Sequence, residues 1–266
     1  DLHSFPTRRS SDLEPATWFR RDRGGTRAVR LRLALEELGP IFMKLGQMLS
    51  TRRDLLPRDI ADELEKLQDR VPPFDSTAAR QIVETTYGRP LAEIFARFDE
   101  APLAAATIAQ VHSAQLADGK EVVVKIVRPG IRAQIELDIE VMYALARLAH
   151  RYWSQAHRLR PVELVREYQK TILDELDLMR EAANAAQLKR NFENSRLLYV
   201  PEVFWDYCRK NLMVMERVHG VLINDVPELK RRGANIKRLA ENGVEIFFTQ
   251  ADRKSTRLNS SHRTGS

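Results

Sequence analysis

The sequence has little of what stabilises secreted or metal-binding proteins. Its single cysteine, Cys208, excludes a disulfide within the chain, and a reducing compartment fits this composition. Six histidines are scattered without the spacing of metal ligands, which argues against a zinc or iron site. No apolar run approaches the roughly eighteen residues of a membrane span, and no signal-peptide pattern is present. The 266 residues suffice for one large domain or two small ones.

Alanine is absent from both ends of the chain, although the interior is rich in it. Residues 1–13 and 252–266 resemble conceptual translations of sequencing adapters, and we expect them to be non-native tails. We also expect the natural sequence to have been cut at about Ala251. The C-terminal tail carries four Lys or Arg and one Asp, half of the net charge of +6. The basic composition is therefore weak evidence for nucleic acid, and we expect no nucleic-acid partner.

Apolar periodicity predicts helices before, between and after two pairs of strand-like segments. Gly39-Pro40 is expected to bend or restart the first helix, and Asp54 to cap the next one, with Pro57 in its first turn. Helical patterns cover residues 28–53, 76–87, 90–95, 131–153 and 161–192, and helix returns after His219-Gly220.

Two pairs of strand-like segments interrupt the helices. Residues 107–116 and 121–127 are joined by the hairpin signal Asp118-Gly119, and a second pair is expected at 197–204 and 211–218. No internal repeat is visible. This order of elements predicts an α+β arrangement with an antiparallel sheet.

Lys125 is a lysine within the apolar strand "EVVVKIV", and two interpretations compete. It is either an edge-strand residue whose stem lies on the sheet, or a lysine that clamps phosphates and needs a carboxylate from a nearby helix. Glu181, in the alanine-rich stretch "REAANAAQ", is the candidate carboxylate, and we expect it to form an ion pair with Lys125.

The loop before Lys125 contains alanines where phosphate-binding loops carry glycines. Glycine lets the backbone approach phosphates and reach positive φ. Ala104, Ala105 and Ala106 keep the loop small but withhold that freedom. The alternative interpretation is a tightly packed strand.

Two further clusters are candidates for function. Lys44 and Gln47 share one helix face, and Gly46 between them indicates close approach of another element. The alternative for Lys44 and Gln47 is a solvated polar face.

In "DELDLMRE", Glu175 and Asp177 point about 160° apart on a straight helix. They therefore serve two partners or the helix distorts there, unless the helix is simply charged and exposed.

These motifs occur together and in order, and residues 31–250 resemble the UbiB family, the bacterial branch of atypical protein-kinase-like proteins needed for ubiquinone biosynthesis. The segment "ELGPIFMKLGQMLS" is similar to the family's KxGQ region, and "PLAAATIAQVH" to its alanine-rich loop. "EVVVKIVRP" resembles its lysine strand and "DELDLMREAANA" its ExD region. "VPEVFWDYCRKNLMVMERVHG" is similar to its strand pair and hinge. Thr107 stands where many relatives have serine.

The resemblance implies a protein-kinase-like N-lobe with an antiparallel sheet and an N-terminal helical extension laid over the active-site cleft. The expected divisions are a non-native tail at 1–13, the extension with its KxGQ motif at 14–100, the N-lobe at 101–219, the start of a C-lobe at 220–251, and a non-native tail at 252–266.

The resemblance also implies roles for individual residues. Lys125 would contact the ATP phosphates, Glu181 would pair with it, and the backbone near Glu216 and Val218 would receive the adenine. A regulatory set would sit over the cleft, namely Lys44, Gly46, Gln47, Glu175 and Asp177. The nucleotide would be covered by Leu103, Ala104, Ala105, Ala106, Thr107, Ile108, Ala109, Gln110 and Val111.

The implied function is that of an ATP-binding atypical kinase or ATPase supporting ubiquinone biosynthesis. Expected partners are ATP or ADP, other ubiquinone-biosynthesis proteins and membrane lipid, at the inner membrane of a bacterial cytoplasm. The family's catalytic loop and Mg²⁺ ligands would follow Gln250, so we expect no metal site and no ATP turnover from this chain itself. The alternative is a non-catalytic scaffold of the same fold that binds lipid or a partner protein. A small-molecule phosphotransferase is a third candidate, against which the alanine loop and the KxGQ helix argue.

Overall fold

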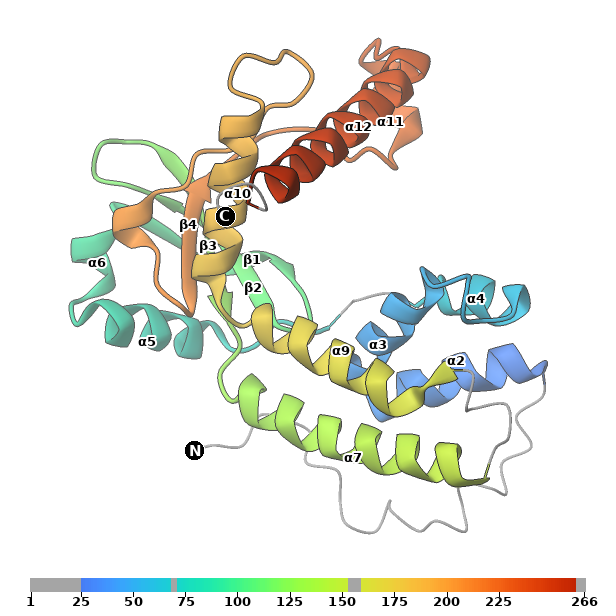
Figure 1. Ribbon diagram of the computed structural model, residues 1–266. Helices are drawn as coiled ribbons and strands as arrows, with labels where there is room; N and C mark the ends of the chain where they lie inside the picture. Colours follow the sequence, from blue (N-terminus) through green and yellow to red (C-terminus); the bar gives the residue numbers. More distant parts are fainter. Residues whose placement is uncertain (1–24, 68–70, 153–158, 262–266) are drawn as a thin grey trace. The chain divides into compact units, whose positions relative to one another are not determined.

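The computed structural model describes residues 25–67, 71–152 and 159–261, with side chains up to residue 250 (Figure 1). The chain divides into two compact units, Asp1–Asp69 and Arg70–Ser266, each described here by itself. The division expected near residue 100 stays a prediction.

The first unit contains three described helices, α2 (Arg27–Leu38), α3 (Pro40–Ser50) and α4 (Arg58–Leu64). The helix restarts at Gly39, as expected, because Gly39 has φ 111° and Pro40 opens α3. Asp54 does not cap α4, contrary to expectation. Its carboxylate accepts a hydrogen bond from Arg52 instead, and the extended residue Pro57 precedes the first turn.

Gly46 of α3 lies close to side chains of other segments of the first unit. A Cβ atom added there would overlap the Cδ1 atom of Leu67 and lie 2.9 Å from Cδ1 of Leu35. The close approach expected from the sequence is therefore present, and the neighbouring element belongs to the same unit.

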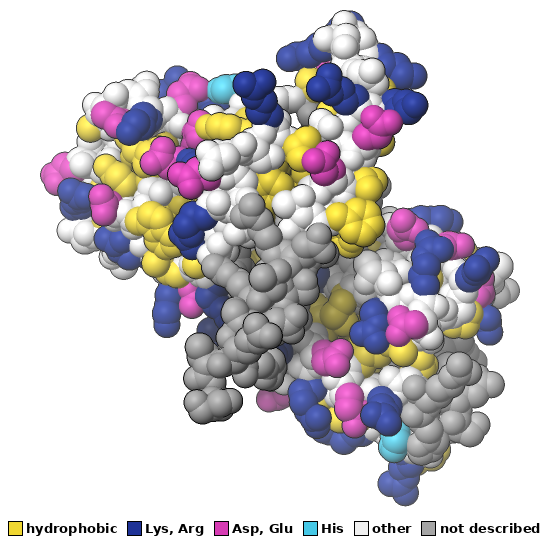
Figure 2. Space-filling model, turned by 45° about the horizontal axis from the view of Figure 1, so that its top comes forward, with side chains coloured by type: hydrophobic (Ala, Val, Ile, Leu, Met, Phe, Trp, Pro, Cys, Tyr) yellow, Lys and Arg dark blue, Asp and Glu magenta, His cyan; other side chains and the backbone are white. Residues whose placement is uncertain are grey.

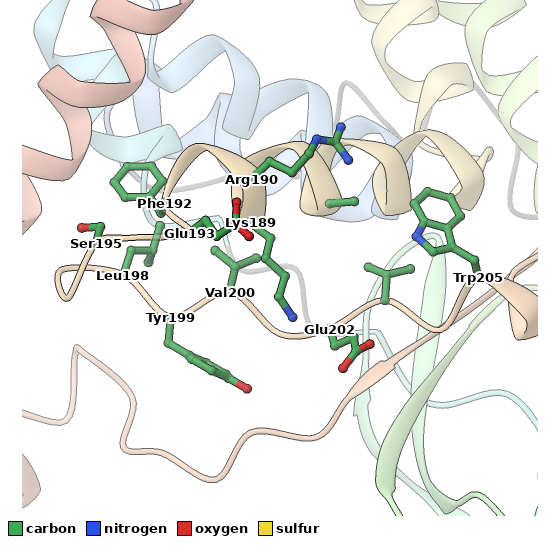
Figure 3. Close-up of a pocket in the computed structure, with 12 residues that line it drawn as sticks. Lys189, Arg190, Phe192, Glu193, Ser195, Leu198, Tyr199, Val200, Glu202 and Trp205 are labelled. Carbon is green, nitrogen blue, oxygen red and sulfur yellow. The ribbon is translucent and has the colours of Figure 1, made fainter.

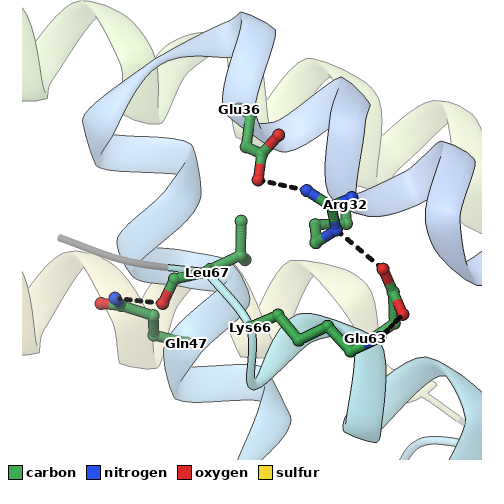
Figure 4. A network of polar contacts seen from close by, with 6 residues as sticks. All are labelled: Arg32, Glu36, Gln47, Glu63, Lys66 and Leu67. Carbon is green, nitrogen blue, oxygen red and sulfur yellow. Dashed lines mark hydrogen bonds and ion pairs between the residues drawn. The ribbon is translucent and has the colours of Figure 1, made fainter. Parts of the chain in front are cut away.

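A polar network holds the helices of this unit together at its surface (Figure 4). The Arg32 guanidinium donates to Glu36 at 2.6 Å and to Glu63 at 2.8 Å. Lys66 also contacts Glu63, and the Gln47 side chain donates to the carbonyl of Leu67 at 3.0 Å. Lys66 and Arg32 hold the pKa of the Glu63 carboxyl below its usual value. Glu63 therefore stays ionised at neutral pH and joins α4 to α2.

The second unit is built on a four-stranded antiparallel sheet in the order β1-β2-β3-β4. Its strands are β1 (Arg97–Ala105), β2 (Ala109–Gln115), β3 (Glu121–Val127) and β4 (Leu212–Glu216). Its helices are α5 (Ser76–Tyr87), α6 (Leu91–Ile94), α7 (Ile131–Tyr152), α9 (Pro161–Asp174), α10 (Leu178–Asn191), the 3₁₀ turn η2 (Trp205–Tyr207), α11 (Val226–Arg231) and α12 (Ile236–Ser261).

Two of the strand predictions need correction. The chain enters the sheet at Arg97, ten residues before the first expected strand at 107–116, with shifts of register on either side of Pro102. Residues 197–204 do not form a strand, because only Val203 bridges to Met215. Pro201 lacks an N–H donor, which limits ladder formation there.

The alternation of β3 determines what each face of the sheet contacts. Val122, Val124 and Ile126 are fully buried and pack with residues of α5 and α6. The intervening residues, Lys125 among them, lie on the opposite face because successive strand side chains alternate. On that face Met213 of β4 packs against α10.

The helix expected over residues 161–192 is two helices. It breaks between Asp174 and Leu178, and the Asp177 carboxylate caps α10 by accepting from the N–H of Met179 at 3.1 Å. The distortion anticipated at "DELD" is thus a complete break. The backbone N–H of Leu178 donates to the carbonyl of Lys210 at 2.9 Å, which ties the start of α10 to the turn before β4.

A buried polar pair lies on the face of the sheet that packs against α5 and α6. Gln110 Nε2 lies 2.8 Å from His112 Nε2, and His112 Nδ1 lies 2.9 Å from the Asp99 carbonyl. An amide nitrogen only donates, so Nε2 of the imidazole accepts and Nδ1 carries the proton. His112 is fully buried, and this burial lowers its pKa, against a smaller opposing effect of the hydrogen bond to Asp99.

The C-terminal helices leave apolar side chains exposed. Basic side chains gather over α11 and the start of α12 (Figure 2). Further along α12, Phe247 and Phe248 are 66% and 59% exposed and contact each other edge to face. No helix within the described ranges is both long enough and apolar enough to cross a membrane.

We predict that Gly46→Ala destabilises the first unit by about 1–3 kcal/mol, because the new methyl group overlaps Leu67 and Leu35. Gly243→Ala is the matched control. It is also a mid-helix glycine, but its Cβ would meet nothing within 4 Å, so only the gain in helix propensity remains. Denaturant unfolding of both variants measures the difference. Equal effects of the two substitutions would contradict the packing account.

We predict that the second unit loses stability as pH falls below about 6.5. The folded pKa of His112 is lowered, so in that range the unfolded chain binds a proton that the folded chain does not. Unfolding free energies measured from about pH 7.5 to about 5 should decline, and His112→Asn should remove that part of the slope. An NMR titration that places the pKa of His112 at or above its ordinary value would contradict this prediction.

Candidate functional site

The expected ion pair between Lys125 and Glu181 is present. Lys125 Nζ lies 2.7 Å from both carboxylate oxygens of Glu181, so β3 and α10 are joined by a two-oxygen contact. The two side chains are 31% and 47% exposed. A pair this open adds little to stability because water screens it. Its consequence is positional: the amine is held at a fixed point and stays reachable from solvent.

Lys125 belongs to a row of side chains that crosses the sheet. Ala104 pairs with Val111, Val111 with Lys125, and Lys125 with Met213. Side chains that pair across antiparallel strands lie on the same face. Small and apolar side chains thus lie beside the lysine on the face that α10 joins.

The alanine-rich segment forms a tight turn between β1 and β2. Leu103–Ala105 end β1, Ala109–Val111 begin β2, and only residues 106–108 connect them, closed by a bond from the N–H of Ala106 to the carbonyl of Ala109 at 2.9 Å. None of its alanines has positive φ, since Arg160 is the only non-glycine residue with positive φ within the described ranges. The turn therefore adopts a shape that alanine tolerates without strain.

Arg128, which directly follows β3, fixes this turn in place. It is buried, its Nε donates to the carbonyl of Ala106 at 2.8 Å, and its backbone N–H donates to the carbonyl of Ile108 at 2.8 Å. A second guanidinium nitrogen donates to the carbonyl of Pro72 at 2.7 Å. Sequence reasoning missed Arg128, and the only available signal was an arginine directly after an apolar strand.

The nine residues expected to cover the nucleotide comprise three exposed ones, four buried ones, and Ala105 and Val111, which are half-buried. Leu103, Ala104 and Ala106 are exposed and accessible. Gln110 is fully buried on the face opposite Lys125, where its Oε1 accepts from the N–H of Phe74 at 3.0 Å. The remaining buried members are Thr107, Ile108 and Ala109. The side chains of these four buried residues are not accessible to a nucleotide.

The end of β4 has one side chain that is already hydrogen-bonded. Glu216 accepts hydrogen bonds from the Tyr199 hydroxyl and from the N–H of Glu202, and the Tyr199 hydroxyl is the larger cause of its lowered pKa. Its own backbone N–H donates to the Glu202 carbonyl. Val218, two residues on, is 52% exposed. The backbone beyond β4 is thus held at Glu216 and accessible at Val218.

The members of the expected regulatory set lie in different units. Lys44, Gly46 and Gln47 belong to the first unit, whereas Glu175 and Asp177 flank the break between α9 and α10 in the second. The roles found for Gly46, Gln47 and Asp177 are local, in packing, in binding the Leu67 carbonyl and in capping α10. Whether the two groups face each other stays a prediction.

A pocket of about 470 Å³ lies at the other end of α10 (Figure 3). Its walls include Lys189, Arg190, Leu198, Tyr199 and Trp205. Its described lining residues do not include Lys125 or Glu181, so the pocket is separate from the ion pair. No cluster of His, Cys, Asp and Glu suited to a metal ion occurs in the part of the chain that the structure describes.

Comparison with known proteins identifies the family to which the chain is similar. Residues 66–257 match the ABC1 atypical kinase-like domain. The chain is 59% identical over 230 residues to a protein named probable protein kinase UbiB from Marinobacter nauticus, an alignment covering 86% of this chain and 42% of that protein. It is 57% identical to the protein of the same name from Pseudomonas fluorescens, covering 91% of this chain and 45% of the relative. The chain thus spans less than half the length of these relatives.

A solved structure agrees with the fold. The Mycobacterium tuberculosis protein Rv3197, solved in complex with erythromycin, is 27% identical with a TM-score of 0.51, over 79% of this chain and 52% of that one. The sheet, with a lysine on β3 held by a glutamate on α10, is the arrangement expected of a kinase-like N-lobe. The chain therefore belongs to the ABC1 atypical kinase-like family, and its sequence groups it with the UbiB proteins.

Proposed function

We propose that this chain binds ATP on the face of the sheet that carries Lys125. The observation that carries the proposal is the two-oxygen contact between Lys125 and Glu181 at 2.7 Å. In kinases a lysine on the corresponding strand binds phosphates while a helix glutamate holds it in position. The same two residue types, on the same two kinds of element, meet here.

The residues present fit a nucleotide. The Lys125 side chain is 31% exposed, so its amine would reach a phosphate oxygen. Ala104 and Val111, which pair in one row with Lys125, would offer a small apolar surface beside it to a sugar or base. The backbone from Glu216 to Val218 would receive the adenine, and the turn at 106–108 would cover the phosphates. Gln110 would contribute through its backbone, since its side chain is committed to Phe74.

The wider activity is proposed from the family. Bound ATP supplies a transferable phosphoryl group, and Mg²⁺ would accompany it. We propose that the whole protein is an atypical kinase or ATPase that supports ubiquinone biosynthesis at the bacterial inner membrane. Within this chain, Lys125 would neutralise phosphate charge and Glu181 would orient Lys125. Lys44 and Gln47, with Glu175 and Asp177, would regulate access.

We predict that Lys125→Ala lowers ATP affinity at least about tenfold, because a charge-assisted contact to phosphate is lost. Lys120→Ala is the matched control, since Lys120 is an exposed lysine in the turn between β2 and β3, where its partner is Asp118. Calorimetric titration with ATP and Mg²⁺, with circular dichroism to verify folding, measures the effect. ATP binding that survives Lys125→Ala unchanged would contradict the proposal. A chain that binds no nucleotide but does bind lipid vesicles would favour the scaffold alternative.

We predict that Ala104→Gly or Ala106→Gly changes ATP or ADP affinity about two- to fivefold, because glycine loosens the ordered turn and opens positive φ. Ala117→Gly is the control, since Ala117 is exposed in the turn between β2 and β3. Titration with each nucleotide gives the ratio of the two affinities. Affinities that match those of the control for both nucleotides would show that the stiffness of the alanine turn has no part in nucleotide preference.

A further inference from the structure

Helix α7 has two apolar faces. One contains the buried residues Ile131, Ile135, Ile139, Met142 and Ala146. It packs beside α9, whose buried face contains Val165, Tyr168 and Ile172 (Figure 1). The other, here called the α7 stripe, consists of the exposed residues Leu137, Val141, Leu145, Leu148 and Tyr152.

The two faces are distinct. At about 100° per residue, each set spans about 80° of the helix, and their centres lie about 120° apart. A partner on the α7 stripe would therefore not displace α9. Exposure is substantial, with Leu137 at 60%, Leu148 at 56% and Tyr152 at 73%. Single exposed apolar residues are common on protein surfaces, but a continuous row over four turns indicates a binding surface.

We propose that the α7 stripe is an interface on which a second copy of this chain packs, its own α7 antiparallel to the first. The spacing of the stripe supports this occupant. Leu137 and Tyr152 lie at equal distances from the midpoint between Ala144 and Leu145, and so do Val141 and Leu148. A two-fold axis at that midpoint sets each residue opposite its counterpart. Ala144 and Leu145 lie at the axis, where exposed Ala144 permits close approach.

The charges of α7 support the same arrangement. Acidic residues occupy its first half, at Glu136, Asp138 and Glu140, and basic residues its end, at Arg147 and Arg151. Antiparallel pairing sets the acidic half of one copy against the basic half of the other, whereas parallel pairing would oppose like charges.

Glu140 and Arg151 border the same edge of the stripe, so each would lie near the other residue of the second copy. Glu140 has no ion pair or hydrogen bond within the described residues beyond its own helix backbone.

With Arg132 included, α7 has three acidic and three arginine residues, a balance that offers little attraction for an anionic membrane.

The expected association is reversible. One pair of helices of this length is a small interface, below the roughly 1,200–2,000 Å² buried in stable complexes. We therefore expect a monomer–dimer equilibrium that shifts with protein concentration.

Charge reversal tests the proposal on the 266-residue chain by sedimentation velocity over a concentration series. Glu140→Arg sets like charges against Arg151, and Arg151→Glu sets them against Glu140. Each substitution should raise the dimer dissociation constant at least about tenfold. The double variant should restore association, because the pair is re-formed with its signs exchanged.

Arg166→Glu, a reversal at an exposed arginine of α9, is the control and should leave the dissociation constant unchanged. Circular dichroism on each variant separates lost association from lost folding. A chain that stays monomeric throughout the series would overturn the proposal, and so would a double variant as weak as the single ones. Loss of binding to lipid vesicles in Leu148→Lys, with no dimer in the wild type, would assign the stripe to a membrane and also overturn it.

Discussion

The alternation of β3 is the constraint on which the rest of the second unit depends. Burial of Val122, Val124 and Ile126 against α5 and α6 fixes which way the strand faces. A slip of one residue would bury Lys125 in that apolar core, where an unpaired ammonium is very costly. The core therefore holds Lys125 on the opposite face, and α10 completes the site by bringing Glu181 to it.

The helix break before α10 is the second requirement for the site. In a continuous helix from 161 to 192, the direction of α9 alone would determine the position of Glu181. Instead Asp177 caps a new helix, and the N–H of Leu178 is fixed to the carbonyl of Lys210 beside β4. Leu178 and Ala182 are then buried against Met213 of the sheet. Glu181 reaches Lys125 because α10 is anchored to the sheet independently of α9.

The sequence predicted what local chemistry decides. The restart at Gly39, the hairpin at Asp118-Gly119 and the span of α5 each follow from a glycine, a turn signal or a helical period. Elements whose formation depends on distant partners were missed. β1 contains a proline and little alternation, and its place in the sheet depends on pairing with β2. Arg128 could not be assigned from sequence, since its partners, the Ala106 and Pro72 carbonyls, come from segments far from it in the chain.

The connections of α7 and α9 link the two surfaces proposed here. This helix pair is inserted between β3, which carries Lys125, and α10, which carries Glu181. Only three residues separate Val127 from Ile131, and three more separate Asp174 from Leu178. Linkers this short leave few free dihedral angles, so a rotation of the helix pair must be taken up by the residues at those junctions. One junction contains Arg128, which holds the alanine turn, and the other contains Asp177, which caps α10. Whatever binds α7 is thus connected by covalent structure to both partners of the ion pair.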